Sequence, residues 1–595
     1  MIRTNMVSYS FDYAKIDELY DFYEIKTSQK HFDTGSYLLD SNSGDIKIRA
    51  ISFYLGNRFL LMMSKNTEND SKIKGVLSAA KEAQYLSCER KSSSNIEQYK
   101  LAQLLLNNLG NFNSDAMSFN NLTGHLYCFH PAWLEKRTKN EETIIYKIPT
   151  LEIAISKDNK LILSVHTFTS EMLRKKIDFG KKKFEEYPKY ILSAHYTLRR
   201  KLVSDKEPGF LMRQTINTKK EIPFIDISNY EKFSQSKMGM LDSVLTRFNN
   251  QYAGIAKINL SEIDNYASFD IDRSVLKENA KIITDYLKDY KIRIVDQVNS
   301  DTSTWFCKEL KSIIESKYVL SASIGKRTSE DALNICVIHN KDYYDGVGDP
   351  HQKQNKGVVQ HVTIEDFLGH EQYAIQTVFN ELLVKKDLES GRIRLYDWTK
   401  LSLEEPISFG LRQEKEDSKQ YWFMDVDPDG RFRVHEEELT LFNDTEYNQM
   451  ISIFDDAVLN DEKVLGVLKY KGYYCRIVDT DIITIPEIEE IRNQLKDGNR
   501  SIRNIESREA LMKSILDIKS FTENEEDYYF VGAIGYGMNR SMSKASSVNK
   551  LVMEGNSRLE FEQLLPLMSV TFVRNGQLTV VPFPFKYLRE YIIVH

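Results

Sequence analysis

One short segment of the chain gathers side chains that could bind a phosphate group. The polar loop of residues 340–357 carries three lysines, and Gln360 stands in the strand-like segment that follows it. Lys385 comes 25 residues after Gln360, near the end of a helix-like segment. In an α/β layer, loops that leave strand ends form the ligand crevice, so these groups can converge on one anion. Lysines would neutralise a phosphate and the amide would orient it, whereas the alternative interpretation is an ordinary solvated loop.

A second segment has the composition of a nucleic-acid contact. Between residues 174 and 201, ten basic side chains stand against three acidic ones, and five Phe and Tyr residues lie among them. Cations attract phosphates and aromatic rings stack on bases, so a nucleic-acid strand could follow this segment. A solvated helical face with core aromatics has about equal weight. The candidate contacts are Arg174, Lys175, Lys176, Lys181, Lys182, Lys183, Arg199, Arg200 and Lys201.

The acidic residues in the last third of the chain suggest two kinds of metal site. Residues 425–436 match the calcium-loop pattern D-x-D-x-D-G-x5-E, but a calcium loop of this kind needs a helix on each side. The flanking residues alternate as in strands around a Pro-Asp-Gly turn, so we expect a β-hairpin here. Alternatively, the same acidic tip could hold a divalent ion in another geometry.

Composition narrows the class of protein. The 595 residues carry a formal net charge of −6, which excludes a uniformly basic, histone-like protein but allows a local basic channel. The length suits about three to five domains. Five scattered cysteines without C-x-x-C argue against a disulfide framework and a cysteine zinc site. The first residues lack an apolar leader, and no apolar run approaches the ~20 residues that cross a bilayer, so we expect a reduced, soluble, cytoplasmic protein.

Alternating strand and helix signals predict α/β layers. Strand-like segments at 292–298 and 333–339 alternate with helix-like segments at 275–290 and 371–386, which favours a largely parallel sheet. The polar stretch 412–420 is a candidate linker to the C-terminal block, whose pattern is again α/β. Other expected elements are two strands within 51–63, a helix over 74–109, a hairpin at 150–168, a helix near 445–459, strands over 464–479 and a helix at 487–495.

The segment 333–386 resembles the MID domain of Argonaute proteins. That domain anchors the 5′ phosphate of a guide strand with an aromatic or basic residue, a lysine, a glutamine and a second lysine. The separation of Gln360 and Lys385 is close to that of the family's glutamine and second lysine. The resemblance implies a phosphate site that leaves room for a Mg²⁺ ion and needs no other cofactor. By position, its residues are His351, Lys353, Lys356, Gln360 and Lys385, with Tyr344 as the other choice for the aromatic residue.

The end of the chain resembles the end of a PIWI domain, in which a Pro-x-Pro stretch leads into the last helix. Pro582, Phe583, Pro584 and Tyr587 carry this likeness, and the carboxylate of His595 would approach the MID pocket. The resemblance covers about residues 300–595 and implies an α/β, multidomain Argonaute-like fold. It contains a Rossmann-like MID domain and an RNase H-like PIWI domain, with the PAZ domain absent or reduced. The expected division is an N-terminal domain (1–175), a basic linker region (176–290), a MID-like domain (291–410) and a PIWI-like domain (411–595).

The metal ligands of a slicing PIWI domain are incomplete in this sequence. Such a domain needs four, usually Asp-Glu-Asp plus His or Asp, and the last helix offers Lys586, Arg589 and Glu590 instead. We therefore expect no catalytic residues and no slicing. The chain is most similar to the Argonaute-like subunit of DdmDE plasmid-defence systems. That resemblance implies a prokaryotic defence protein that holds a 5′-phosphorylated guide, expected to be DNA, binds target DNA and recruits a helicase-nuclease partner. One alternative is a Mg²⁺-dependent, RNase H-like nuclease, for which the PIWI resemblance implies Asp425, Asp427, Asp479 and Asp481 as metal ligands. The other alternative is a Ca²⁺-dependent interaction protein that uses residues 425–436.

Overall fold

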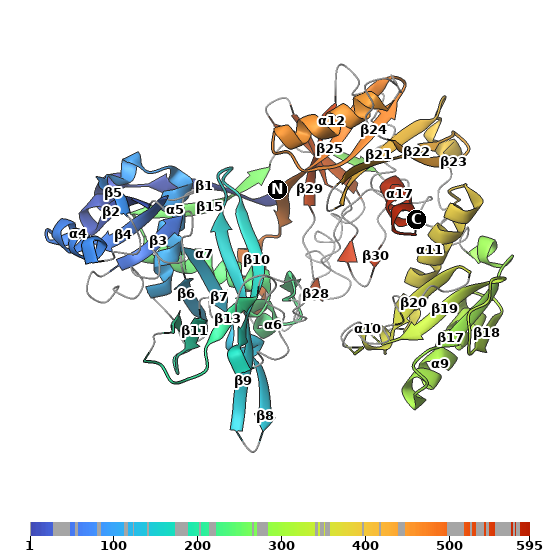
Figure 1. Cartoon of the computed structure of the whole chain (residues 1–595), viewed down its shortest axis with the longest axis horizontal. Coiled ribbons are helices and arrows are strands. Elements are labelled where there is room, and N and C mark those ends of the chain that lie inside the picture. The colour runs from blue at the N-terminus through green and yellow to red at the C-terminus, as the bar shows by residue number, and fades with distance from the viewer. Residues whose placement is uncertain are drawn as a thin grey trace. The chain divides into compact units, whose positions relative to one another are not determined.

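The computed structural model of the chain forms two compact units (Figure 1). The first contains residues 1–264, 482–509 and 536–545, and the second contains residues 265–481, 510–535 and 546–595. The structure describes the whole chain except residues 1, 28–47, 54–57, 80–84, 112–116, 123, 140–141, 173–188, 202–203, 214–221, 264–266, 271–283, 340–342, 345–349, 351–356, 370, 395–397, 416–417, 438–446, 497–516, 524–525, 531–540, 543–546, 554–572, 575–576, 579–582 and 595.

A small antiparallel sheet lies near the start of the first unit, in the order β3-β4-β2-β5. Its strands are β2 (Tyr20–Thr27), β3 (Ile48–Phe53), β4 (Arg58–Ser64) and β5 (Tyr85–Lys91). Helix α4 (Asn69–Ala79) contributes Ile73 to the core of this sheet, and α5 (Gln98–Asn108) follows β5. The expected single helix over 74–109 is therefore wrong, because β5 pairs along β2 in the middle of that range.

A larger antiparallel sheet of the first unit has the order β12-β11-β13-β10-β9-β7-β6, with β8 on β9. The predicted hairpin is confirmed: β9 and β10 flank a turn in which Asn159 has a φ of 58°, a conformation that Asn tolerates. Figure 1 labels most of these strands. They are β6 (Ser118–Leu122), β7 (His125–Phe129), β8 (Glu135–Lys139), β9 (Glu142–Ile155), β10 (Leu161–Ser170), β11 (Lys189–Leu192), β12 (Leu198–Arg200) and β13 (Phe210–Arg213).

A carboxylate on this sheet lies between two imidazoles. Glu152 of β9 contacts His125 of β7 through one oxygen and His166 of β10 through the other, each at 2.6 Å. Burial raises the pKa of Glu152, but the hydrogen bonds from the two histidines outweigh burial and bring the pKa down to about 2. The carboxylate thus ties three neighbouring strands together on one face of the sheet.

The remaining elements of the first unit come from distant parts of the sequence. Strand β1 pairs with β15 and, at Arg3 and Thr4, with the last residues of β25 (Tyr473–Ile485). Helix α13 confirms the predicted helix at 487–495 and contacts α7 through the ion pair of Arg492 with Asp242. The elements are β1 (Ile2–Phe11), α1 (Tyr13–Leu19), α6 (Tyr230–Ser234), α7 (Lys237–Gln251), β15 (Ala256–Ile263) and α13 (Ile488–Lys496).

A four-stranded parallel sheet opens the second unit, as the sequence predicted. Its order is β18-β17-β19-β20, and all of its ladders are parallel. Helix α9 packs on β17 and β18, and α11 packs on β20 and α9. Strand β19 is buried along its whole length, which suits its run of seven mostly apolar residues in a central position. The elements are β17 (Lys291–Asp296), α9 (Asp301–Lys317), β18 (Ala322–Gly325), β19 (Ala332–Ile338), β20 (Val359–Thr363), α10 (Ile364–Phe367) and α11 (Glu371–Ser390).

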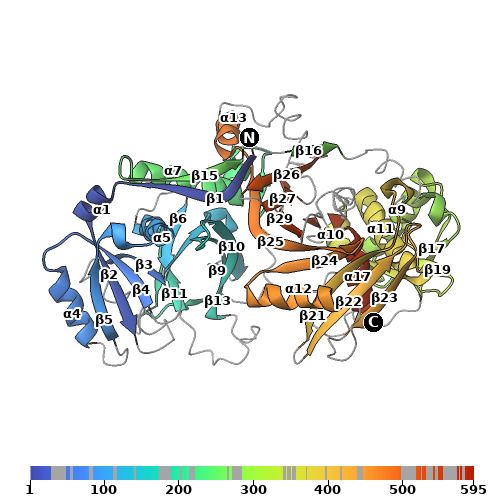
Figure 2. The ribbon, with the colours of Figure 1, turned by 90° about the horizontal axis from the view of Figure 1, so that it is seen from above.

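The second sheet of this unit has the order β16-β26-β27-β29-β25-β24-β21-β22-β23. Helix α12 lies along it against β24 (Figure 2), which confirms the helix predicted near 445–459. The predicted linker at 412–420 is wrong: β21 and β22 pair there, from Ile407 with Val426 to Lys415 with Ser418. The elements are β16 (Ala267–Asp270), β21 (Ile407–Lys415), β22 (Ser418–Val426), β23 (Phe432–Glu437), α12 (Asn448–Leu459), β24 (Val464–Tyr470), β25 (Tyr473–Ile485), β26 (Asp517–Glu523), β27 (Glu526–Phe530), β29 (Ser547–Met553) and α17 (Phe583–Val594).

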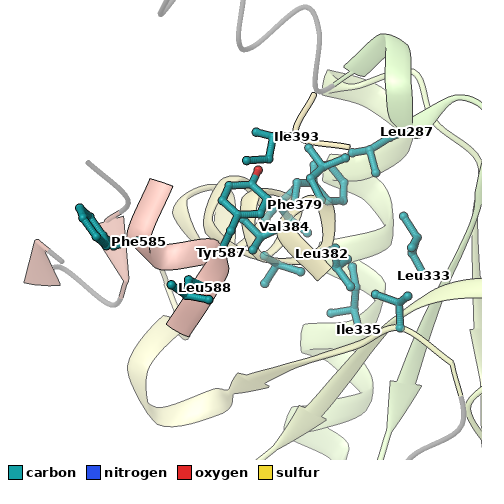
Figure 3. Packing of buried hydrophobic residues seen from close by; sticks show 14 of the residues in the cluster. Leu287, Leu333, Ile335, Phe379, Leu382, Val384, Ile393, Phe585, Tyr587 and Leu588 are labelled. Atoms are coloured by element: carbon teal, nitrogen blue, oxygen red, sulfur yellow. The ribbon is translucent and has the colours of Figure 1, made fainter. Parts of the chain in front are cut away.

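One hydrophobic core joins both sheets of the second unit. Side chains of the parallel sheet and α11, such as Ile335 and Leu382, belong to the same cluster as Phe585, Tyr587 and Leu588 of α17 (Figure 3). The mixed α/β, multidomain character predicted from the sequence is confirmed, while the four-domain division stays a prediction. All five cysteines are free thiols in this structure. Within the described residues, no helix is both long and apolar enough to span a bilayer.

Candidate anion-binding site

Gln360 and Lys385 meet at the edge of the parallel sheet. Gln360 is the second residue of β20, and Lys385 stands on α11, which packs against that strand. The Lys385 Nζ donates to Gln360 Oε1 at 3.0 Å and to the carbonyl oxygen of Val359 at 2.6 Å. Helix α11 thus places the Lys385 ammonium group beside the strand that carries the Gln360 amide. The convergence that a phosphate site requires is present at these two residues, and their role stays a prediction.

The pair of Gln360 and Lys385 lies in polar, partly buried surroundings. The Lys385 ammonium donates to two uncharged oxygens, the side-chain oxygen of Gln360 and the backbone oxygen of Val359, and these bonds orient it. Both side chains are partly buried, where a charge interacts more strongly than in bulk water. On the adjacent strand, burial raises the pKa of the Cys336 thiol to about 12, although the Lys385 ammonium acts in the opposite direction. A phosphate oxygen would find a cation and an amide side by side.

A second polar group lies at the carboxyl ends of β19 and β20. His339 directly follows β19, and its Nδ1 lies 2.6 Å from Glu365 Oε1 in α10. The Tyr343 ring stacks on the His339 ring with centroids 3.7 Å apart, and 64% of Tyr343 is exposed. Tyr344, one of the two predicted aromatic residues, accepts the backbone N–H of His339 through its hydroxyl at 3.0 Å. An exposed ring backed by an imidazole is a surface on which a base could stack.

His339 is not among the residues that the sequence predicted for the candidate site. It is one of four histidines in residues 339–370. A usable signal existed, because His339 follows the last buried residue of a central parallel strand, and ligands bind beyond the carboxyl ends of such strands. Gln360 pairs with Ile335, and His339 comes four residues after Ile335, so it lies roughly 13 Å farther along the strands at about 3.3 Å per residue.

Several predicted residues lie outside the described residues. Those of the phosphate set are His351, Lys353 and Lys356. Those of the basic segment are Arg174, Lys175, Lys176, Lys181, Lys182 and Lys183. The terminal His595 lies outside as well. Their predicted roles stay predictions.

The described part of the basic segment makes contacts within the protein. Arg199 holds Asp205 through two hydrogen bonds of 2.7 Å, and Lys201 contacts Glu171 at 2.6 Å. The guanidinium of Arg200 is buried over the Tyr190 ring, which itself packs against Phe168 in the core. In this part of the chain the aromatic residue belongs to the core, which is the alternative interpretation of the segment. Contact of these three cations with nucleic acid stays a prediction.

The four aspartates of the nuclease alternative do not converge. Asp425 of β22 accepts hydrogen bonds from Ser408 and Tyr447, each at 2.6 Å, whereas Asp479 of β25 accepts from Lys463 at 2.5 Å. Two strands, β24 and β21, separate β25 from β22, which amounts to roughly 14 Å at about 4.8 Å per strand. Paired catalytic metals lie only about 4 Å apart. Among the described residues, no three His, Cys, Asp or Glu side chains are grouped to hold a metal ion.

The calcium-loop pattern forms the predicted hairpin. Residues 425–436 span the turn between β22 and β23, where Gly430 donates to the carbonyl oxygen of Asp427 at 2.8 Å. Gly430 has a φ of +83°, and Trp398 lies where a Cβ would stand. Glycine is therefore required by the turn itself, without a calcium ion. Strands, and not helices, flank the motif.

Among known proteins, similarity to this chain is found in solved structures. No family model matches the chain, and no curated protein matches it. Among solved structures, the chain is similar to an Argonaute described as Aa-Ago with externally bound siRNA, at 10% identity and a TM-score of 0.40. The alignment covers 100% of this chain and 97% of that one. A likeness this weak establishes neither the family nor the function, so the functional argument depends on the site itself.

Proposed function

We propose that this chain is a nucleic-acid-guided DNA-binding protein that holds the phosphorylated 5′ end of a guide strand at Gln360 and Lys385. The observation that carries the proposal is the hydrogen bond between Lys385 Nζ and Gln360 Oε1 at the edge of a parallel sheet. This is the pair that the MID resemblance requires. In the proposal, the loop residues His351, Lys353 and Lys356 complete the phosphate site, and the guide base stacks near Tyr343.

The phosphate in this proposal is held by protein donors. Mg²⁺ prefers several oxygen ligands, usually including carboxylates. The described part of the site instead offers an ammonium group and an amide whose oxygen already accepts from that ammonium. The described donors therefore do not fit a Mg²⁺ ion, and no step is assigned to one.

The biological role that we propose is defence against plasmids and other invading DNA. The guide, which we expect to be DNA, would direct the chain to its target. A helicase-nuclease partner would then degrade the target, since the chain's own Asp425 and Asp479 are held in separate places by their own hydrogen bonds. Slicing by this chain is not part of the proposal.

Binding of end-labelled oligonucleotides tests the proposal directly. Dissociation constants are measured for one DNA sequence carrying either a 5′ phosphate or a 5′ hydroxyl, and for the RNA equivalents. A hydrogen bond to a charged group contributes about 1.5–3 kcal/mol, so Lys385→Ala should weaken binding of the phosphorylated strand by roughly 10- to 150-fold. Binding of the hydroxyl strand should change little. Equal losses for the two strands would contradict the proposal.

The neighbouring residue provides a matched control. Lys386 is also a lysine of α11, but its ammonium pairs with Glu389 at 2.7 Å and lies over the Tyr290 ring. Lys386→Ala removes the same charge from the same helix and should leave the preference for the 5′ phosphate unchanged. A similar loss in both variants would show that general charge, and not the site, attracts the strand.

A further inference from the structure

We infer that the last helix, α17, positions Lys385 through two buried polar contacts with α11, and thereby determines how well the site distinguishes a phosphorylated end. This inference rests on the proposed function. It assigns a positioning role to Lys586 and Tyr587, which lie on α17 and take no part in the phosphate contact itself.

The first contact is an ion pair between the two helices. Lys586 Nζ contacts Glu381 Oε1, and the two side chains are only 6% and 3% exposed. Burying two charges removes them from water, so such a pair adds little to stability compared with apolar side chains of the same size. Its contribution is to allow one arrangement of the two helices, because any other leaves a buried charge without its partner.

The second contact lies farther along α11. The Tyr587 hydroxyl donates to Asp387 Oδ2 at 3.0 Å, and both residues are completely buried. The same carboxylate oxygen accepts the backbone N–H of Arg394 at 2.9 Å, just beyond the end of α11. The carboxylate of Asp387 therefore joins α17 to the segment that leaves α11.

Lys385 stands between these two contacts on the helix. Residues 381 and 387 are about 9 Å apart along the axis, at 1.5 Å per residue. Contacts at both positions fix the rotation and the axial position of α11. The Lys385 Nζ is one of the groups whose place depends on that register, because it must reach Val359 and Gln360 on β20.

Apolar packing holds α17 in the same place. Phe585 contacts Phe409 of β21 edge to face, with ring centroids 5.4 Å apart, and it fills the space beside Gly466 of β24. Tyr587 lies close to α11 in the cluster that Figure 3 shows. This packing explains why α17 is attached, whereas the polar contacts explain why α11 has one register. The two roles can therefore be separated by mutation.

The test removes both charges and keeps the packing. In the full chain, Glu381→Met combined with Lys586→Met replaces the ion pair by two apolar side chains of similar length. The readout is the ratio of dissociation constants for DNA with a 5′ hydroxyl and DNA with a 5′ phosphate, together with the unfolding midpoint. We expect the ratio to fall at least fivefold while the affinity for the hydroxyl strand and the midpoint stay near those of the wild type.

A milder variant covers the case in which the double variant does not fold. Tyr587→Phe removes one hydroxyl without changing the ring and should lower the same ratio about two- to threefold. A control in the first unit, Arg492→Met with Asp242→Leu, removes another largely buried ion pair and should leave the ratio unchanged.

The outcomes separate this inference from the proposed function. A wild-type chain without a preference for the 5′ phosphate contradicts the proposed function. A wild-type preference that the folded α17 variants retain overturns the positioning role alone. An equal loss of affinity for both strands also overturns it, because a purely structural role would affect them alike.

Discussion

Removing one partner of the Glu381–Lys586 ion pair should destabilise the second unit far more than removing both. Lys586→Met leaves a carboxylate that is only 3% exposed without this cation. An uncompensated buried charge of this kind costs about 3–5 kcal/mol. Adding Glu381→Met removes that charge, and apolar replacement of a buried pair is neutral or stabilising by about 1–4 kcal/mol. The double variant should therefore be close to the wild type or above it in stability.

Urea unfolding of the four proteins of this double-mutant cycle measures the effect. Tryptophan fluorescence is a suitable signal, because Trp305, Trp398 and Trp422 all belong to the second unit. Midpoints should shift without a change in the slope of unfolding free energy against urea. The reasoning is refuted if Lys586→Met costs less than about 1 kcal/mol, or if the double variant is as unstable as the sum of the two single variants.

Three other predictions concern stability and reactivity. The pKa of Glu152 in the folded protein is about 2, below its ordinary value of 4.5. The contribution of this carboxylate to stability is therefore full above pH 4.5 and is lost as the pH falls towards 2. The difference in urea midpoint between the wild type and Glu152→Gln should close over that pH range. Gly466→Ala should lower the melting temperature, because its Cβ would meet the Phe585 ring, whereas Gly75→Ala in α4, with open space at its Cβ, should raise stability by up to about 1 kcal/mol. Burial raises the pKa of all five thiols, so alkylation by iodoacetamide should be slow in the native protein and should reach all five cysteines in denaturant.

The parallel sheet could be predicted because its central strand β19 has a distinctive apolar sequence. Seven consecutive, mostly apolar residues in β19 suit a strand that is covered on both faces. Strand β5 could not be predicted in the same way, because it is an edge strand with polar residues such as Ser87 and Glu89. The hairpin of β21 and β22 was mistaken for a linker for a similar reason: its outer end, Glu414–Lys419, is polar on both strands.

The candidate site was only partly predictable. Gln360 and Lys385 were paired by their resemblance to a known arrangement, since spacing alone also suited a solvated loop. The contact of His339 with Glu365 joins the end of one strand to a short helix 26 residues later, and no local pattern encodes such a contact. The buried partners Glu381 and Lys586 are 205 residues apart, which places their pairing beyond any periodicity argument.

Because the contact between Glu381 and Lys586 joins residues so far apart in the sequence, we expect the second unit to unfold as a single cooperative element. Closing a chain loop of this length costs roughly 5 kcal/mol in conformational entropy, and this cost is offset only when the contacts of α11 with α17 are complete. A fragment that ends before α17 would expose the apolar side of α11 and leave Glu381 without this partner. We therefore expect the amide hydrogens of β19 and β24 to exchange with solvent together, in one opening of the whole unit, and a chain cleaved just before residue 583 to aggregate.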